Sequence, residues 1–162
     1  MYHSRSSNIA VIMTLVIAAV LLAPSAISLP TGVDNVSNAG CSCHGTTPSD
    51  SVTASIEGLP DSYNYSEEYE LTLSFLGGPS NPNNINQGGF NLWASHGTLS
   101  VVDGTAQISV NDGSATHTEA GNDQTSWTVK WTAPSDDRNV DLVLHVNSVN
   151  GNAGTDQGAQ GD

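Results

Sequence analysis

Two cysteines and a histidine stand within four consecutive positions, Cys41-Ser42-Cys43-His44. Two thiols followed at once by a histidine are the residues that attach haem covalently, with the imidazole on the iron. The usual spacing leaves two residues between the cysteines, whereas this chain leaves a single serine. The pair Cys43-His44 keeps the usual adjacency, and Cys41 must reach the second vinyl group through a shorter loop. The motif predicts haem c, with Cys41 and Cys43 as thioether donors and His44 as the proximal iron ligand.

The same residues are open to two other interpretations. Cys41 and Cys43 could be joined by a local disulfide, because Cα atoms two residues apart can fall within disulfide range. Such a small loop constrains the unfolded chain little, and His44 would have no role. Thiolate and imidazole also suit copper or zinc, but zinc needs further ligands and none is local.

The first 28 residues have the pattern of a secretory signal peptide. Arg5 precedes a continuous apolar run over residues 9–23, and Ala26 and Ser28 are small residues at the expected cleavage site. The run is shorter than the roughly 20 apolar residues that span a bilayer. We therefore expect the mature chain to begin near Leu29 and to be secreted, outside the cytoplasm or at the cell surface.

The charge balance excludes two classes of partner. The chain has 3 Lys and Arg against 16 Asp and Glu, for a formal net charge of −13. Nucleic acids and anionic membranes both require basic residues, so neither is an expected partner. We expect a redox partner protein with a basic surface. Attachment to a membrane would be peripheral, or through segments missing from this chain.

Period-two alternation of apolar residues predicts the fold. It recurs in seven short runs separated by turn signals, over residues 52–56, 69–75, 90–94, 99–102, 106–110, 127–131 and 142–146. Asp103-Gly104 is typical of a hairpin turn between two of them. This pattern predicts an all-β, antiparallel, immunoglobulin-like sandwich of about seven to eight strands. Trp127 and Trp131 are expected as core anchors.

Several stretches carry a family resemblance: Gly40 to Gly45, Ile56 to Pro60, Tyr69 to Leu73, Gly88 to Leu92, His117-Thr118 and Trp127 to Pro134. In their order and spacing, they resemble the secreted Reeler-like domain of the choice-of-anchor V type. The resemblance implies a β-sandwich over residues 51–162, preceded by an irregular segment over residues 29–50 that carries the cytochrome-c-like motif. It also implies a further strand after a Gly-Asp step, so we expect the chain to be truncated at its C-terminus.

A haem iron also needs a ligand or an open site on its second face. Both methionines, Met1 and Met13, fall within the predicted signal peptide. The remaining histidines are His96, His117 and His145. The resemblance places its His-Thr pair at His117-Thr118, so His117 is the expected distal ligand. His96 follows a strand end, and His145 ranks last because it alternates with the apolar residues of its strand.

Calcium is a further cofactor to weigh, because several aspartates lie in predicted turns. Asp103, Asp112, Asp123 and Asp156 lack the spacing of an EF-hand, so calcium ranks below haem.

The functional prediction is an extracytoplasmic haem-c-binding protein for electron transfer. The alternative is a non-enzymatic cell-surface adhesion or ligand-binding β-sandwich with a local Cys41–Cys43 disulfide. No nucleophile motif, phosphate loop or carboxylate pair is evident, so we expect an electron carrier or binding module rather than an enzyme.

Overall fold

The computed structural model describes residues 31–32 and 49–151. The predicted signal peptide, the Cys41–His44 motif and the stretch after Gly151 lie outside these residues, and what was predicted for them stays a prediction. Within the described part, no helix is long and apolar enough to cross a membrane.

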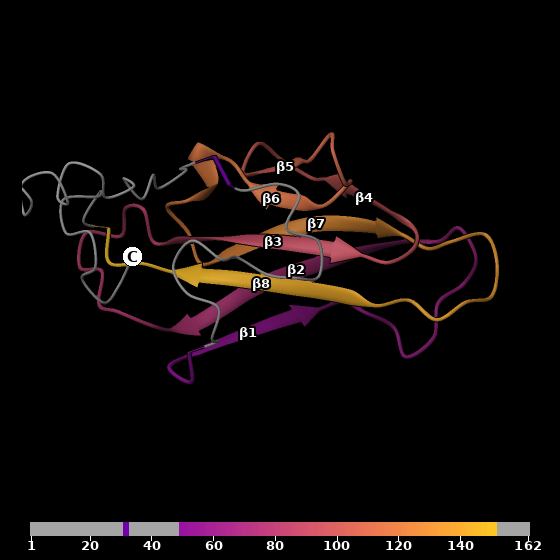
Figure 1. Cartoon of the computed structure of the whole chain (residues 1–162), viewed down its shortest axis with the longest axis horizontal. Helices are drawn as coiled ribbons and strands as arrows, with labels where there is room; N and C mark the ends of the chain where they lie inside the picture. Colours follow the sequence, from indigo (N-terminus) through magenta and orange to yellow (C-terminus); the bar gives the residue numbers. More distant parts are fainter. Residues whose placement is uncertain (1–30, 33–48, 152–162) are drawn as a thin grey trace, which may run out of the picture.

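Within the described residues, eight strands form two four-stranded antiparallel sheets (Figure 1). Sheet A has the order β1-β2-β7-β4, with strands β1 Val52–Glu57, β2 Glu68–Gly77, β7 Ser126–Thr132 and β4 Thr98–Val101. Sheet B has the order β5-β6-β3-β8, with strands β5 Ala106–Ile108, β6 Ala115–His117, β3 Gly88–Ala94 and β8 Leu142–Ser148. One short 3₁₀ helix, η1 (Glu119–Gly121), follows β6. The predicted all-β antiparallel sandwich is confirmed.

The core lies between the sheets and is built by the alternation seen in the sequence. Its buried side chains come chiefly from β2, β7 and β3: Leu71, Leu73, Phe75, Trp127, Val129, Trp131, Phe90 and Leu92. The indole N–H of Trp127 donates to the carbonyl of Gly121 at 2.7 Å, and that of Trp131 donates to the carbonyl of His96 at 3.0 Å. Because both buried indoles have partners, their burial leaves no polar group unsatisfied. Both tryptophans are core anchors, as predicted.

Two features differ from the sequence prediction. Strand β6 was not predicted, because three residues are too short to show an alternation. The prediction of a hairpin at Asp103-Gly104 is wrong, because β4 pairs with β7 in sheet A, whereas β5 pairs with β6 in sheet B. The turn therefore carries the chain from one sheet to the other. Asp103 Oδ1 stabilises it by accepting from the backbone N and the Oγ1 of Thr105, at 2.8 and 2.6 Å.

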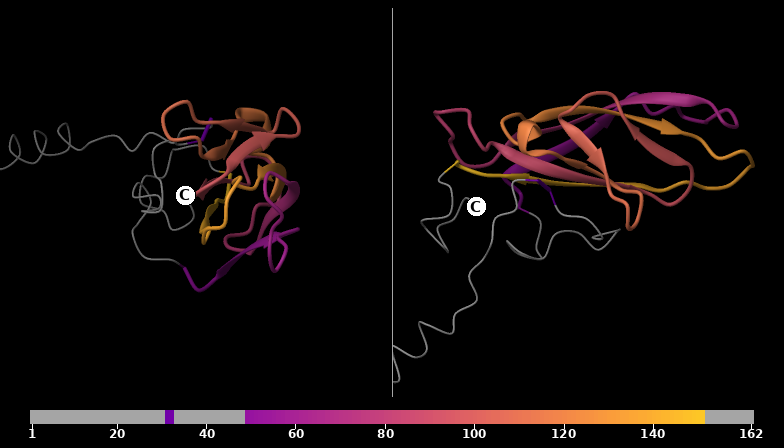
Figure 2. Two further views of the ribbon diagram at one scale, coloured as in Figure 1. Left: turned by 90° about the vertical axis from the view of Figure 1, so that its right-hand side faces the viewer. Right: turned by 90° about the horizontal axis from the view of Figure 1, so that it is seen from above.

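Two surfaces matter for function. The loop end of the sandwich comprises residues 58–67, 95–97 and 133–141; it lies at the right of Figure 1 and faces the viewer in the left panel of Figure 2. Face B is the outer face of sheet B. It carries the residues that alternate with the core residues of β3, β6 and β8, namely Gly89, Asn91, Trp93, Thr116, Val143, His145 and Asn147.

Candidate functional site

The three histidines weighed as distal ligands occupy different places. His117 is the last residue of β6, and His145 lies in β8 on face B. His96 lies in the turn after β3, at the loop end. Gly89, beside which His117 packs, is near the start of β3, so the strand separates His117 from His96 by roughly 20 Å. The structure thus groups His117 with His145 and sets His96 apart.

The His117 side chain takes the place of a backbone pairing. The β6–β3 ladder includes the pair Asn91↔Thr116 and stops there. The next backbone N–H of β3, from Phe90, donates to Nδ1 of His117 at 3.2 Å. The ring lies above Gly89, where an added Cβ would be 2.1 Å from Cε1 of His117. Position 89 must therefore be glycine for the imidazole to lie on face B.

The His117 ring can be held in two ways. The carbonyl of Phe90 lies 3.4 Å from Nδ1, beside the N–H that donates to it. When Nδ1 accepts from that N–H, the proton of the neutral ring is on Nε2. When Nδ1 carries the proton and donates to the carbonyl, Nε2 has a free lone pair. The second state is that of metal-bound histidines, which donate their other N–H to a carbonyl or carboxylate.

His145, which ranked last among the candidate distal ligands, lies near the same glycine as His117. It pairs with Asn91, and Gly89 pairs with Asn147, so Gly89 and His145 are diagonal neighbours in the ladder. Diagonal neighbours are about 7–8 Å apart. Nε2 of His145 is buried and has no hydrogen-bond partner in the structure. The alternation predicted its outward direction, but no sequence signal showed that this outer face is partly buried.

Face B is more buried than the outer face of a sandwich usually is. Asn91 and Thr116 are each only 2% exposed. Thr116 Oγ1 donates to the carbonyl of Phe90 at 2.7 Å, and Nδ2 of Asn91 donates to Oγ of Ser114 at 3.1 Å. These bonds satisfy polar groups that would otherwise be costly to bury.

The described residues Thr31 and Gly32 lie against β5 and β6. Nε2 of Gln107 donates to the carbonyl of Thr31, and a Cβ on Gly32 would be 2.2 Å from Oγ1 of Thr116. A hollow of about 320 Å³ lies between these two residues and β5.

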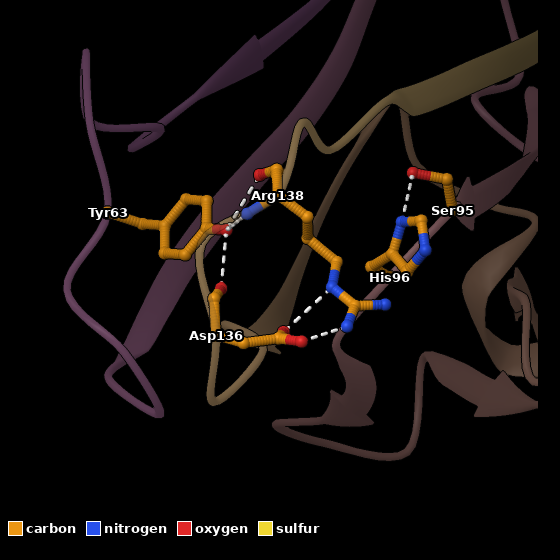
Figure 3. A network of polar contacts seen from close by, with 5 residues as sticks. All are labelled: Tyr63, Ser95, His96, Asp136 and Arg138. Atoms are coloured by element: carbon orange, nitrogen blue, oxygen red, sulfur yellow. Dashed lines mark hydrogen bonds and ion pairs between the residues drawn. The ribbon is translucent and has the colours of Figure 1, made fainter.

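The loop end is held together by a polar network (Figure 3). The hydroxyl of Tyr63 lies 3.1 Å from the carbonyl oxygen of Asp136 and 2.7 Å from that of Arg138, and it accepts from the backbone N of Arg138 at 3.1 Å. The guanidinium of Arg138 forms a bidentate pair with the carboxylate of Asp136. This hydrogen bonding, chiefly from Arg138, lowers the pKa of Asp136. The β1–β2 loop is thereby fastened to the β7–β8 loop.

His96 belongs to this network. Its Nδ1 lies 3.2 Å from Oγ of Ser95, which also accepts from the backbone N of Asp141 at 2.9 Å (Figure 3). Its charge contributes, after Arg138, to the lowered pKa of Asp136. These contacts tie the β3–β4 turn to the β7–β8 loop, which is a structural role at the end remote from His117.

An aromatic cluster connects the loop end to the core. Trp131 stacks on Tyr69 with ring centroids 5.8 Å apart, and Tyr63 meets Trp131 edge-on at 5.6 Å. Tyr65 continues the cluster outward, 6.4 Å from Tyr63, and is 59% exposed. The loop end therefore presents an aromatic side chain on a rigid base.

The predictions of calcium and of a metal at His44 and His117 stay predictions, since the described part of the chain includes only some of the residues concerned. There, no three His, Cys, Asp or Glu side chains gather into a group that could hold a metal ion. Asp103 caps its own turn, and Oδ1 of Asp112 accepts from the backbone N and Oγ of Ser114. Asp156 lies beyond the described residues.

Comparisons with known proteins bear on the fold. No family model and no curated protein matches the chain. Among solved structures, the Reelin-N domain of F-spondin is 22% identical with a TM-score of 0.42, covering 59% of this chain and 76% of that one. The reeler domain of human F-spondin (fragment 1) is 21% identical with a TM-score of 0.43, covering 70% and 90%. The chain is structurally similar to reeler domains. The similarity concerns the fold alone.

The pH dependence of stability tests the environment of His117. Burial lowers its pKa below the ordinary value of 6.5, against a weaker opposing effect of the Phe90 hydrogen bond. The unfolded chain then binds more protons than the folded chain between the lowered pKa and 6.5. We expect this contribution to be complete above that range and to be lost as the pH falls through it.

Urea denaturation from pH 7.5 to 5 measures this loss. His117→Gln should show a shallower fall in unfolding free energy than the wild type, while the control Leu76→Ser, which changes an exposed side chain that does not titrate, keeps the wild-type slope. Identical slopes for the wild type and His117→Gln would contradict the assignment.

Proposed function

We propose that this protein is a non-enzymatic, extracytoplasmic ligand-binding module that acts at the cell surface through its loop end. The observation that carries the proposal is the joining of three loops by Tyr63, Ser95 and the Asp136–Arg138 pair, beneath the exposed Tyr65. Loops on a rigid scaffold are where β-sandwiches usually bind ligands.

Rigidity favours binding because less conformational entropy is lost when a partner docks. Tyrosine suits this use, since it offers a large, stiff surface with an apolar body and a polar tip. Leu59, 41% exposed in the same β1–β2 loop as Tyr65, adds apolar area. Both residues add apolar area to the loop end.

The surroundings of this apolar area are acidic. The three loops carry exposed carboxylates at Asp61, Glu67, Asp137 and Asp141, and the one arginine among them, Arg138, is paired with Asp136. The whole chain has a net charge of −13. This field attracts a basic protein surface at long range, and the attraction weakens as salt is added. The expected partner is a polypeptide with Lys or Arg next to an apolar side chain.

Peptides selected on the folded protein from a random display library test this proposal. We expect the enriched sequences to be basic, and Tyr65→Ser to weaken their binding by about tenfold, the loss typical of an aromatic contact residue. The control is Leu76→Ser, since Leu76 is 76% exposed on β2 but lies at the opposite end of the sandwich. Binding that Tyr65→Ser leaves unchanged, or that Leu76→Ser weakens equally, would contradict the proposal.

A second candidate function, electron transfer through haem c, is favoured by the position of His117. Gly32, which precedes the Cys41–His44 motif in the sequence, packs against Thr116 on the same face as the His117 imidazole. The ring fits an axial ligand, because Nδ1 can donate to the carbonyl of Phe90 and leave Nε2 free. Cys41 and Cys43 would form the thioethers, with His44 as proximal and His117 as distal ligand. Bound haem would supply one-electron redox chemistry.

Expression with a c-type maturation system tests this second function. We expect haem to remain attached after denaturation in a pyridine haemochrome assay, and Cys41→Ala to leave a single thioether. His117→Ala should convert a low-spin spectrum to high spin, with His96→Ala as the unaffected control. Complete loss of haem on denaturation, or a mass two hydrogens below that of the reduced apo-protein, would instead support the Cys41–Cys43 disulfide.

A further inference from the structure

His117 and His145 are two imidazoles held on one face by neighbouring strands. The ring of His117 fills the space above Gly89, and His145 is the diagonal neighbour of that glycine across the β3–β8 ladder. Core residues flank His145 on the inner side of β8, since Leu144 and Val146 pack between the sheets. Both histidines therefore present their rings to face B, on either side of β3 at Gly89.

Each ring has a nitrogen suited to ligation. Nε2 of His145 is buried without a hydrogen-bond partner, a condition that normally costs stability and calls for an explanation. In His117, the backbone of Phe90 occupies Nδ1 and leaves Nε2 as the nitrogen that can act outward. A bound cation would take up the lone pairs of both Nε2 atoms.

The local charge permits a cation. Two strong bases, Lys130 and Arg138, belong to the described residues, and each is already paired with a carboxylate away from face B. Lys130 bonds Glu68 on sheet A, and Arg138 bonds Asp136 at the loop end. The acidic surface as a whole further favours binding of a divalent ion.

We propose that His117 and His145 together bind one divalent transition-metal ion on face B. Imidazole pairs suit Cu(II), Ni(II) and Zn(II), with the strongest binding expected for Cu(II). Water completes the coordination, so the site is an open one. It requires neither Cys41, Cys43 and His44 nor the loop end, so it is compatible with the ligand-binding function proposed above. It competes with distal haem ligation, because both uses need the lone pair on Nε2 of His117.

Titration with Cu²⁺ of the mature chain, beginning at Leu29, tests the site; this chain lacks His3, which at the third position would itself bind Cu²⁺ together with the terminal amine. The chain should carry Cys41→Ser, Cys43→Ser and His44→Gln, so that the thiols and the neighbouring imidazole contribute nothing. We expect one tightly bound Cu²⁺ per chain by calorimetry, and a loss of affinity of at least about tenfold in either His117→Gln or His145→Gln. The matched control, His96→Gln, places the same change at the loop end and should bind as tightly as its parent.

Electron paramagnetic resonance of the Cu²⁺ complex provides a readout that does not depend on the variants folding. Hyperfine structure from two imidazole nitrogens is expected in the parent chain and is lost in the double variant His117→Gln/His145→Gln. A spectrum with oxygen ligands alone, or affinity that persists in the double variant, would overturn the proposal. Affinity lost equally in His96→Gln would overturn it as well.

Discussion

The packing of the His117 ring over Gly89 is the contact on which the arrangement of face B depends. The imidazole accepts from the backbone of β3 where the β6 ladder ends, and an added Cβ at position 89 would be 2.1 Å from the ring. Because the His117 side chain takes the place of the next backbone pair with β3, β6 ends after three residues. The same packing also brings an imidazole onto the outer sheet face that carries His145.

The core supports two surfaces of different character, the loop end and face B. Trp127 and Trp131 anchor β7 between the sheets, and their indole N–H groups bond the carbonyls of Gly121 and His96. Through the second of these bonds the core supports the β3–β4 turn at the loop end. The loop end is therefore rigid and exposed, which suits it to a macromolecular partner, whereas face B is partly buried and carries polar side chains, which suits it to a small cation or cofactor.

Sequence patterns predicted those parts of the structure that depend on one strand at a time. The alternation of apolar residues predicted β2 and β7, the burial of both tryptophans and the outward direction of His145. It could not show that β4 and β5 belong to different sheets, because a strand's period says nothing about its partner. It also missed the three-residue β6 and the proximity of His117 to His145. Those features arise from the register across β6, β3 and β8, which no local pattern encodes.

The most direct test compares Gly89→Ala with Gly104→Ala by urea denaturation. A methyl group at position 89 must displace the His117 ring, whereas nothing lies within 4 Å of a Cβ at position 104. We predict that Gly89→Ala lowers the unfolding free energy by about 2 kcal/mol, in the range typical of overpacking. Gly104→Ala should stay within about 0.5 kcal/mol of the wild type. Equal stabilities for the two variants would contradict the placement of His117 on face B.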